Sequence, residues 1–312
     1  MILLTGSTGF IGSSLSHRLL GSGKKFITLS RSPSNNVSRG VIHHCLDINV
    51  NSDWEYVLLG VQTVIYTAGR AHVAINSTTK HEFVETNLTS TLKFARQAAS
   101  LGVQRFVYLS TLNINGISCD RPVSEMDPVA PVDLAAKLKL EVEIALMKIN
   151  SDTGMEVVII RPPLVYGVGV KANFLSLLKL SSLSMPLPFG SVNNKRSMIY
   201  VENLVDFIIR CIDHPNAANQ TFVVSDGEDL SLKSLITYIR KVMGRSPLLF
   251  PVPVGLFKLA GKLVGKSGVV DRLVGDFQVD SSKARELLDW TPPYSVEQGI
   301  TATVLDFYKR KN

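Results

Sequence analysis

The chain begins Met1-Ile-Leu-Leu-Thr-Gly6-Ser-Thr-Gly9-Phe-Ile-Gly12, where a short apolar run leads into three glycines spaced three residues apart. The apolar run predicts a buried strand, and the apolar positions over residues 9–20 recur at the spacing of a helix. In a turn between a strand and a helix, the first glycine permits the tight bend and the second lets a pyrophosphate approach backbone N–H groups. The third lets the helix pack closely on the strand. We therefore predict a dinucleotide site formed by Gly6, Thr8, Gly9, Phe10, Ile11 and Gly12.

Further short runs rich in β-branched residues alternate with helical patterns along the first half of the chain. We predict strands over residues 2–4, 26–29, 41–46, 63–66, 106–109 and 155–160, and helices over residues 9–20, 81–101 and 133–151. Nearly continuous apolar strands that alternate with helices indicate a parallel sheet covered on both faces. We therefore expect an α/β fold with a doubly wound parallel sheet of the Rossmann type. Ligands of such sheets bind beyond the carboxyl ends of the strands.

The pattern changes after Arg161-Pro162-Pro163, where proline becomes frequent and the predicted helices become short. We therefore predict two domains, a dinucleotide-binding Rossmann domain over residues 1–165 and a smaller C-terminal α/β substrate domain over residues 166–312. Residues 199–224 again have the pattern of a helix and a strand, so we expect this segment to return to the first domain.

Composition and charge exclude several classes of protein. Of the 312 residues, 45% are apolar and 19% charged, which is typical of a globular chain. No apolar run reaches the roughly 18 residues of a membrane span, and the first residues lack the pattern of a signal peptide, so we expect a cytoplasmic protein. The net charge of +7 favours anionic partners. Because the basic residues form no long run and only 7% of residues are aromatic, we predict a phosphate-bearing small molecule and no nucleic acid.

The three cysteines, Cys45, Cys119 and Cys211, lie far apart in the sequence and are odd in number. This spacing is typical neither of a disulfide framework nor of a metal cluster. We therefore predict no metal site.

The second predicted strand bears on the choice of cofactor. An NAD site usually has an acidic residue about 20 residues after the glycines, whereas this chain has Ser30-Arg31-Ser32 there. Because an arginine and hydroxyl groups suit a 2′-phosphate, we predict Ser30 and Arg31 as cofactor contacts and prefer NADP(H), with NAD(H) as the alternative. Asp47 and Ile48, after the third strand, are predicted to contact the adenine.

A set of motifs spread over essentially the whole chain resembles the extended short-chain dehydrogenase/reductase family, in particular its nucleotide-sugar epimerases, dehydratases and 4-ketoreductases. These motifs are Gly6-x-x-Gly9-x-x-Gly12, Asp47-Ile48, Thr67-Ala68-Gly69, Asn87, Leu109-Ser-Thr111, Asn115-Gly116, Lys139-Leu-Glu141, Arg161-Pro-Pro-Leu-Val-Tyr-Gly167, Arg196-Ser-Met-Ile-Tyr-Val201 and Asp280-Ser-Ser-Lys-Ala-Arg-Glu-Leu-Leu-Asp-Trp-Thr-Pro292. The resemblance implies that Thr67, Ala68, Gly69, Asn87, Lys139 and Pro162 contact the cofactor. It also implies hydride transfer between a nicotinamide and a sugar carbon.

The resemblance assigns the catalytic positions and shows one departure. Enzymes of this family use a Ser or Thr, a tyrosine that exchanges a proton with the sugar oxygen, and a lysine one helical turn later. Thr111 and Lys139 match the first and the last, but Ala135 stands where the tyrosine is expected. A register with Lys137 as the lysine fits less well and also supplies no tyrosine. Either the alanine is an engineered substitution or this is a natural member with altered chemistry, in which Asp133, Tyr166 or a water relays protons.

Further matches concern the substrate and the oligomer. Asn173, Arg196 and, with less regular spacing, Arg272 match positions that bind the nucleoside diphosphate of a UDP-sugar in this family. Two guanidinium groups that converge on a diphosphate are chemically well suited to it.

The predicted helices 81–101 and 133–151 correspond to those through which relatives of this family pair, so we expect a homodimer.

Three functions follow from these observations. We prefer an NADPH-dependent reductase of a UDP-linked 4-keto-6-deoxy-N-acetylhexosamine in surface polysaccharide synthesis, such as a UDP-N-acetylquinovosamine dehydrogenase. The alternative is a C4 epimerase of UDP-N-acetylglucosamine or UDP-glucose, or of the polyprenyl-diphosphate-linked sugar. Because of Ala135, a third interpretation is a catalytically impaired protein that binds NAD(P) and UDP-sugars.

One segment outside these motifs is amphipathic. Over residues 254–266, leucines and other apolar residues share one helical face, and Lys258, Lys262 and Lys266 are spaced four apart. Such a helix either packs on the smaller domain or contacts an anionic membrane surface.

Overall fold

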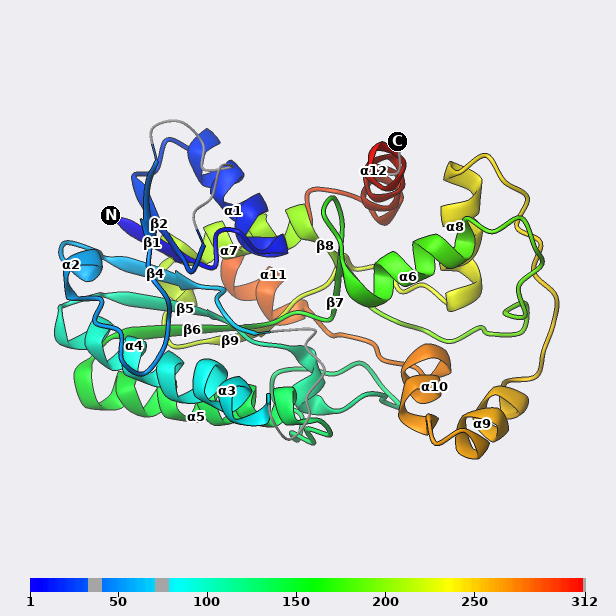
Figure 1. Cartoon of the computed structure of the whole chain (residues 1–312), viewed down its shortest axis with the longest axis horizontal. Coiled ribbons are helices and arrows are strands. Elements are labelled where there is room, and N and C mark those ends of the chain that lie inside the picture. The colour runs from blue at the N-terminus through cyan, green and yellow to red at the C-terminus, as the bar shows by residue number, and fades with distance from the viewer. Residues whose placement is uncertain (33–40, 71–78, 311–312) are drawn as a thin grey trace.

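The computed structural model describes residues 1–32, 41–70 and 79–310. Its centre is a parallel sheet of seven strands (Figure 1). In spatial order these are β3 (Ile42–Cys45), β2 (Phe26–Ser30), β1 (Ile2–Thr5), β4 (Thr63–Tyr66), β5 (Arg105–Leu109), β6 (Glu156–Arg161) and β9 (Thr221–Val223). The order reverses on either side of β1, which is the doubly wound arrangement. The predicted fold class is therefore confirmed.

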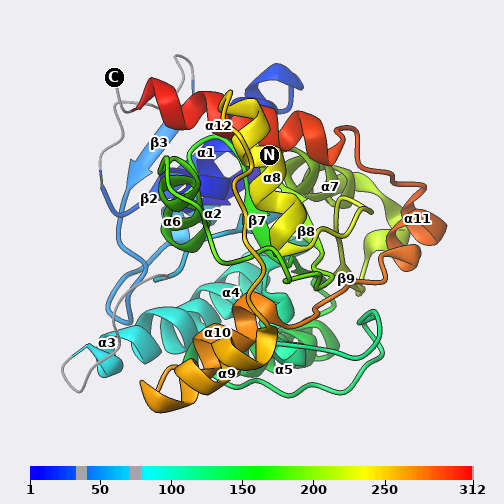
Figure 2. The same ribbon diagram turned by 90° about the vertical axis from the view of Figure 1, so that its right-hand side faces the viewer.

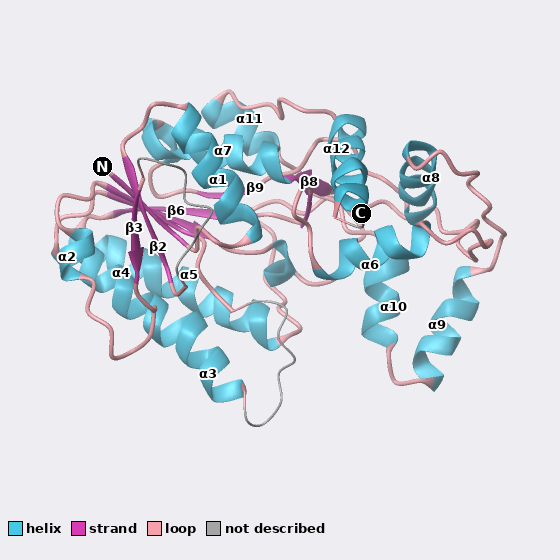
Figure 3. Cartoon of the chain, turned by 45° about the horizontal axis from the view of Figure 1, so that its top comes forward, coloured by secondary structure: helices cyan, strands magenta, loops and turns pink. Residues whose placement is uncertain are grey.

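Helices cover both faces of this sheet (Figures 1 and 3). One face carries α1 (Phe10–Gly21), α7 (Val201–Asp213) and α11 (Ser282–Leu288), and the other carries α4 (Ser90–Ser100) and α5 (Leu134–Thr153), with α2 (Glu55–Leu58) at its edge. Because both faces are covered, the central strands are buried along their length. The edge strand β3 differs, since its residues are exposed or half-buried.

The chain leaves the large sheet after β6 and builds the rest of the molecule around a second, two-stranded sheet (Figure 2). This sheet pairs β7 (Leu164–Tyr166) with β8 (Met198–Tyr200). This part of the chain also forms α6 (Ala172–Ser181), α8 (Leu232–Val242), α9 (Val254–Leu263), α10 (Ser267–Val274) and α12 (Val296–Lys309). Within the predicted return segment 199–224, α7 packs on the large sheet and β9 joins it, whereas Ile199 and Tyr200 pair in the small sheet.

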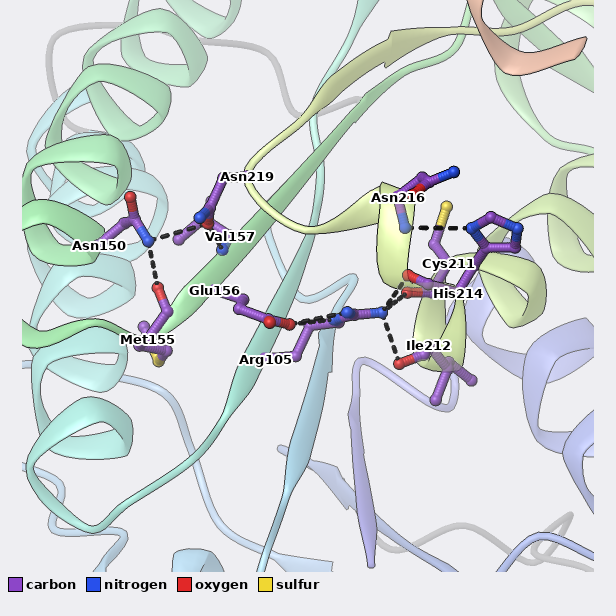
Figure 4. A network of polar contacts seen from close by, with 10 residues as sticks. All are labelled: Arg105, Asn150, Met155, Glu156, Val157, Cys211, Ile212, His214, Asn216 and Asn219. Atoms are coloured by element: carbon purple, nitrogen blue, oxygen red, sulfur yellow. Dashed lines mark hydrogen bonds and ion pairs between the residues drawn. The ribbon is translucent and has the colours of Figure 1, made fainter. Parts of the chain in front are cut away.

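A polar network holds the return segment to the amino ends of the large sheet (Figure 4). The buried Arg105 guanidinium, at the start of β5, donates to the carbonyl oxygens of Cys211, Ile212 and His214 at 2.8, 2.9 and 3.0 Å. It also pairs with Glu156 at 2.7 Å. Cys211 and Ile212 lie in the last turn of α7, where carbonyls have no partner within the helix, so the Arg105 side chain satisfies them and fixes α7 against β5 and β6.

The helix predicted over residues 81–101 is present from Lys80 to Ser100, but it contains one π-helical turn that the sequence pattern did not predict. The chain forms α3 (Lys80–Val84), one π-helical turn (Glu85–Thr89) and then α4. A π-turn accommodates one extra residue per turn and turns the following side chains to new directions. Its buried member is Asn87, a predicted cofactor contact.

Two features are absent from the described part of the chain. None of its helices is long and apolar enough to cross a membrane. No group of three or more His, Cys, Asp and Glu side chains gathers there as a metal site requires.

Candidate active site

The glycine turn lies between β1 and α1, and two of its glycines are required by close contacts. Gly6 has φ of +71°, and a Cβ there would lie 2.9 Å from the amide nitrogen of Ala68. A Cβ on Gly12 would lie 2.1 Å from the carbonyl oxygen of Gly6. The helix thus begins directly against the turn, as the pyrophosphate-binding arrangement demands.

The polar groups at this turn fit a bound pyrophosphate. Gly9 is the N-cap of α1 and offers no side chain to the first backbone N–H groups, so these point outward with the positive end of the helix dipole. The buried hydroxyls of Ser7, in the turn, and Ser110, after β5, have no hydrogen-bond partner within the described residues. Buried hydroxyls normally have a partner. The residues present therefore fit a dinucleotide, and Ser7 and Ser110 are polar groups that the sequence analysis did not single out.

The adenosine end of the predicted site lies at the carboxyl ends of β2 and β3. Arg31 is exposed, whereas the Ser30 hydroxyl turns inward and donates to the carbonyl of Ser32 at 2.8 Å. Asp47 is exposed, and its carboxylate accepts from the amide of Ile48 at 2.9 Å. The Ile48 side chain is buried in the core. Arg31 and Asp47 are thus available to a ligand, while Ser30 and Ile48 mainly support the local structure.

The segment after β4 is held beside the glycine turn. The Thr67 hydroxyl donates to the carbonyl of Thr5 at 2.7 Å, and the Ala68 amide donates to the Thr5 hydroxyl at 3.3 Å. The Asn87 side chain accepts from the amide of Arg70 at 2.9 Å and donates to its carbonyl at 3.1 Å. The π-turn therefore orients Asn87 to fix the backbone that follows Gly69, and it acts on the predicted cofactor site through that backbone.

The end of β5 brings Thr111 and Pro162 together. The amide of Leu112 donates to the carbonyl of Pro162 at 2.9 Å, so the chain after β5 is tied to the chain after β6. Thr111 is half-buried and caps the short 3₁₀ helix Leu112–Asn115, because its hydroxyl accepts from the amide of Asn113 at 3.3 Å. Its hydroxyl hydrogen remains available to a ligand, since a hydroxyl that accepts one bond still donates another.

Lys139 points from α5 toward the end of β5. Its Nζ donates to the carbonyl of Leu109 at 2.7 Å and lies 4.5 Å from the centre of the Tyr108 ring. Burial lowers the pKa of Lys139 to about 8, and the negative charge of Glu143 offsets part of this effect. Lys137 is exposed, whereas Lys139 contacts the end of β5, so Lys139 is the lysine that the structure brings to this site.

Ala135 lies in the first turn of α5, one helical turn before Lys139, and is exposed. Residues four apart share one helical face, so position 135 faces the same side as Lys139.

Two residues predicted as alternative proton relays, Asp133 and Tyr166, are engaged in other hydrogen bonds. Asp133 caps α5 by accepting from the amide of Ala136 at 2.9 Å, and its second oxygen accepts from Arg272 at 2.7 Å. The Tyr166 hydroxyl donates to Asp226 at 2.7 Å within the core, and burial raises the pKa of Tyr166.

The predicted substrate residues come from the second part of the chain. Arg196 is half-buried, and its guanidinium donates to the carbonyl of Gly275 at 3.0 Å. Gly275 lies three residues after Arg272 in the sequence. Burial lowers the pKa of Arg196, the negative charge of Asp276 offsets part of this effect, and the positive charge of Arg272 adds a smaller lowering. The two guanidinium groups therefore repel each other, which an anion between them would relieve. Asn173 is exposed in the first turn of α6.

Comparison with protein families matches residues 2–225 to the NAD dependent epimerase/dehydratase family. The chain belongs to this family. The family resemblance inferred from the motifs is thereby confirmed. A UDP-glucose 4-epimerase of Vibrio cholerae is 41% identical over 100% of this chain and 96% of its own length. An N-acetyl-alpha-D-glucosaminyl-diphospho-ditrans,octacis-undecaprenol 4-epimerase of Escherichia coli O157:H7 is 23% identical over 97% of this chain and 94% of its own length.

Two nucleotide-sugar 4-epimerases with solved structures have the same fold. The UDP-glucose 4-epimerase of Thermotoga maritima, solved with UDP-glucose, has a TM-score of 0.81 at 23% identity and covers 100% of this chain and 99% of its own. The UDP-glucuronic acid 4-epimerase of Bacillus cereus, solved with NAD, has a TM-score of 0.83 at 20% identity, with coverage of 100% and 99%. At these identities the likeness establishes the fold.

Proposed function

We propose that this chain is a nicotinamide-dependent C4 epimerase of a UDP-sugar, with a slow proton-transfer step. The observation that carries the proposal is that Lys139 and Thr111 lie at the carboxyl end of β5, on the same edge of the sheet as the glycine turn after β1, while Arg272 contacts Asp133 at the start of the helix that carries Lys139. The glycine turn suits a dinucleotide, and the guanidinium groups of Arg196 and Arg272 suit a nucleoside diphosphate. The 41% identity to a UDP-glucose 4-epimerase over the full chain supports the same activity.

The chain's own residues bind and orient the reactants in this proposal. A bound nicotinamide supplies hydride exchange at the sugar carbon. Lys139 holds the cofactor ribose, and its positive charge favours an anionic oxygen nearby. The Thr111 hydroxyl donates to the reacting sugar oxygen, and the arginine pair binds the diphosphate and thereby orients the sugar.

The weak point of this site is the proton carrier. By the family pattern Ala135 replaces a tyrosine, and an alanine methyl carries no proton. With Asp133 and Tyr166 both engaged in other hydrogen bonds, water is the remaining carrier. Loss of a positioned acid–base group costs roughly 10² to 10⁴ in rate.

The Ala135→Tyr variant tests this proposal. We expect it to convert UDP-glucose or UDP-N-acetylglucosamine to the C4 epimer about 10² to 10⁴ times faster than the parent chain, because it restores the acid–base group. Chromatography of the nucleotide sugars measures both rates, and Ala135→Phe serves as the control without a hydroxyl. If Ala135→Tyr remains as inactive as Ala135→Phe while both bind the cofactor, the epimerase proposal is wrong. The chain is then a catalytically impaired protein that binds NAD(P) and UDP-sugars.

Arg31 favours the NADPH-dependent 4-keto reductase as a second candidate. Its exposed guanidinium at the end of β2 suits a 2′-phosphate. The neighbouring structures solved with NAD support the other cofactor for the fold. Mass spectrometry of the purified protein distinguishes the two. Retained NAD⁺ supports the epimerase, whereas weak, exchangeable binding that prefers NADPH and is lost in Arg31→Ala supports the reductase.

Two further assignments belong to this proposal. A lipid-linked sugar diphosphate is the alternative epimerase substrate, which the exposed apolar residues of α9 beside the helix of Arg272 favour. We also propose that α5 and the helix over residues 80–100, which comprises α3, the π-turn and α4, form a homodimer interface, since Ile144 on α5 is 64% exposed. Sedimentation of Ile144→Lys against the parent chain tests the homodimer.

A further inference from the structure

The net positive charge of the chain falls on one segment. Residues 230–270 contain seven basic residues and no Asp or Glu, which leaves 26 basic and 26 acidic residues in the rest of the chain. The seven are Lys233, Arg240, Lys241, Arg245, Lys258, Lys262 and Lys266. The net charge of +7 therefore belongs to this segment, which forms α8, α9 and the start of α10 at the end of the molecule that Figure 2 turns toward the viewer.

The same segment exposes large apolar side chains. Leu256, Leu259, Leu263, Val264 and Val269 are 54, 55, 80, 67 and 62% exposed. The first three are spaced as i, i+3 and i+7, so they form a stripe along one face of α9. Soluble proteins rarely expose contiguous apolar patches without a binding role.

This stripe is not the face by which α9 attaches to the protein. Phe257 stacks on Phe189 with ring centres 5.6 Å apart, and a Cβ on Gly261 would lie 2.7 Å from the Val270 side chain. These contacts fix α9 against α10 and the smaller hydrophobic core. The exposed leucines point elsewhere, on a helical hairpin that projects from the molecule (Figures 1 and 3).

We propose that the α9–α10 hairpin docks peripherally on an anionic lipid bilayer. Leu256, Leu259 and Leu263 enter the boundary between headgroups and acyl chains, and Lys258, Lys262 and Lys266 contact lipid phosphates. Lysine stems can lie along an apolar surface while their ammonium groups reach the headgroups. The docking residues differ from Arg272, which lies on α10 and belongs to the proposed substrate site, and the inference does not depend on which reaction that site performs.

The combination of charges and leucines selects a lipid surface over other partners. A second copy bound through the same face would bring two sets of Lys258, Lys262 and Lys266 together, which is unfavourable. A nucleic acid would pair with the lysines but would leave the leucines in water. An anionic bilayer satisfies both, because apolar burial and electrostatic attraction add.

Vesicle flotation with the full chain tests the proposal. We expect binding to vesicles of phosphatidylcholine containing about one third phosphatidylglycerol, little binding to phosphatidylcholine alone, and a decrease at high salt. Replacing Lys258, Lys262 and Lys266 by Gln should weaken binding about 100-fold, and replacing Leu256, Leu259 and Leu263 by Ser at least tenfold.

Matched variants control for total charge and apolarity. Lys148, Lys179 and Lys309 are exposed on other helices, so their replacement by Gln removes the same charge. Leu20, Leu59 and Leu305 are exposed leucines elsewhere, so their replacement by Ser is the apolar control. Both sets should retain binding. The proposal is wrong if the parent chain does not float at low salt, if either control set lowers binding as much as the hairpin variants, or if the leucine variants alter only self-association in sedimentation.

Discussion

Gly12 shows at the scale of one residue how closely the predicted cofactor turn is packed. Because a Cβ at this position would lie 2.1 Å from the Gly6 carbonyl oxygen, Gly12→Ala must displace the start of α1. We expect cofactor binding at least about tenfold weaker and a free energy of unfolding lower by about 1 to 3 kcal/mol. A Cβ on Gly21, at the other end of α1, would have no neighbouring atom within 4 Å among the described residues, so Gly21→Ala is the control. Equal cofactor affinity in the two variants, measured by calorimetry, would contradict this account.

Lys139 gives the site a pH dependence that denaturation can measure. Its pKa is about 8 in the folded protein against 10.5 for an ordinary lysine, so between these values the unfolded chain binds more protons. The free energy of unfolding of the parent chain should therefore rise with pH in this range relative to Lys139→Met, by at most about 1.4 kcal/mol per pH unit. Urea denaturation from about pH 7 to pH 10 measures both proteins. Parallel curves for the two would show that the Lys139 pKa is not lowered.

At the scale of secondary-structure elements, a buried ion pair joins α5 to β6. Arg161 donates to Glu143 at 2.6 Å, and the side chains of Arg161 and Glu143 are only 8 and 4% exposed. Removing one partner leaves the other charge buried and unpaired, so Glu143→Gln should cost about 3 to 5 kcal/mol of unfolding free energy. Glu141, on the exposed side of the same helix, provides the matched control Glu141→Gln, with an expected change within about 0.5 kcal/mol. Equal midpoints in urea would refute a structural role for the pair.

The same elements show what a sequence reveals about the fold and the site. The strands and the glycine turn were predictable, because buried strands need local apolar runs and the turn needs glycine at fixed positions. The π-turn at Glu85–Thr89 was not, since its residues have an ordinary helical pattern and only packing selects the wider turn. The contact of Arg105 with the end of α7 and that of Arg272 with Asp133 join residues more than 100 positions apart. No local pattern encodes such pairs.

At the scale of the whole molecule, the Arg272 and Asp133 pair links the two parts of the chain. The side chains are 43 and 38% exposed, so the pair contributes little to stability. If Arg272 binds the diphosphate, the substrate must compete with Asp133 for it. Asp133→Asn keeps the helix cap but frees Arg272, so it should bind UDP several-fold more tightly, whereas Arg272→Gln should bind it about tenfold more weakly. Titration calorimetry with UDP measures both constants. Changes of the same sign would contradict this competition.

The concentration of positive charge in residues 230–270 has a kinetic consequence. A particle whose excess charge lies at one end experiences a torque near a negative plane, and screening confines this torque to about the last 10 Å of approach at 0.1 M salt. The torque therefore turns the α9–α10 hairpin toward the membrane before the exposed leucines of α9 enter it. Salt concentration then governs how often the protein arrives, and the leucines govern how long it stays.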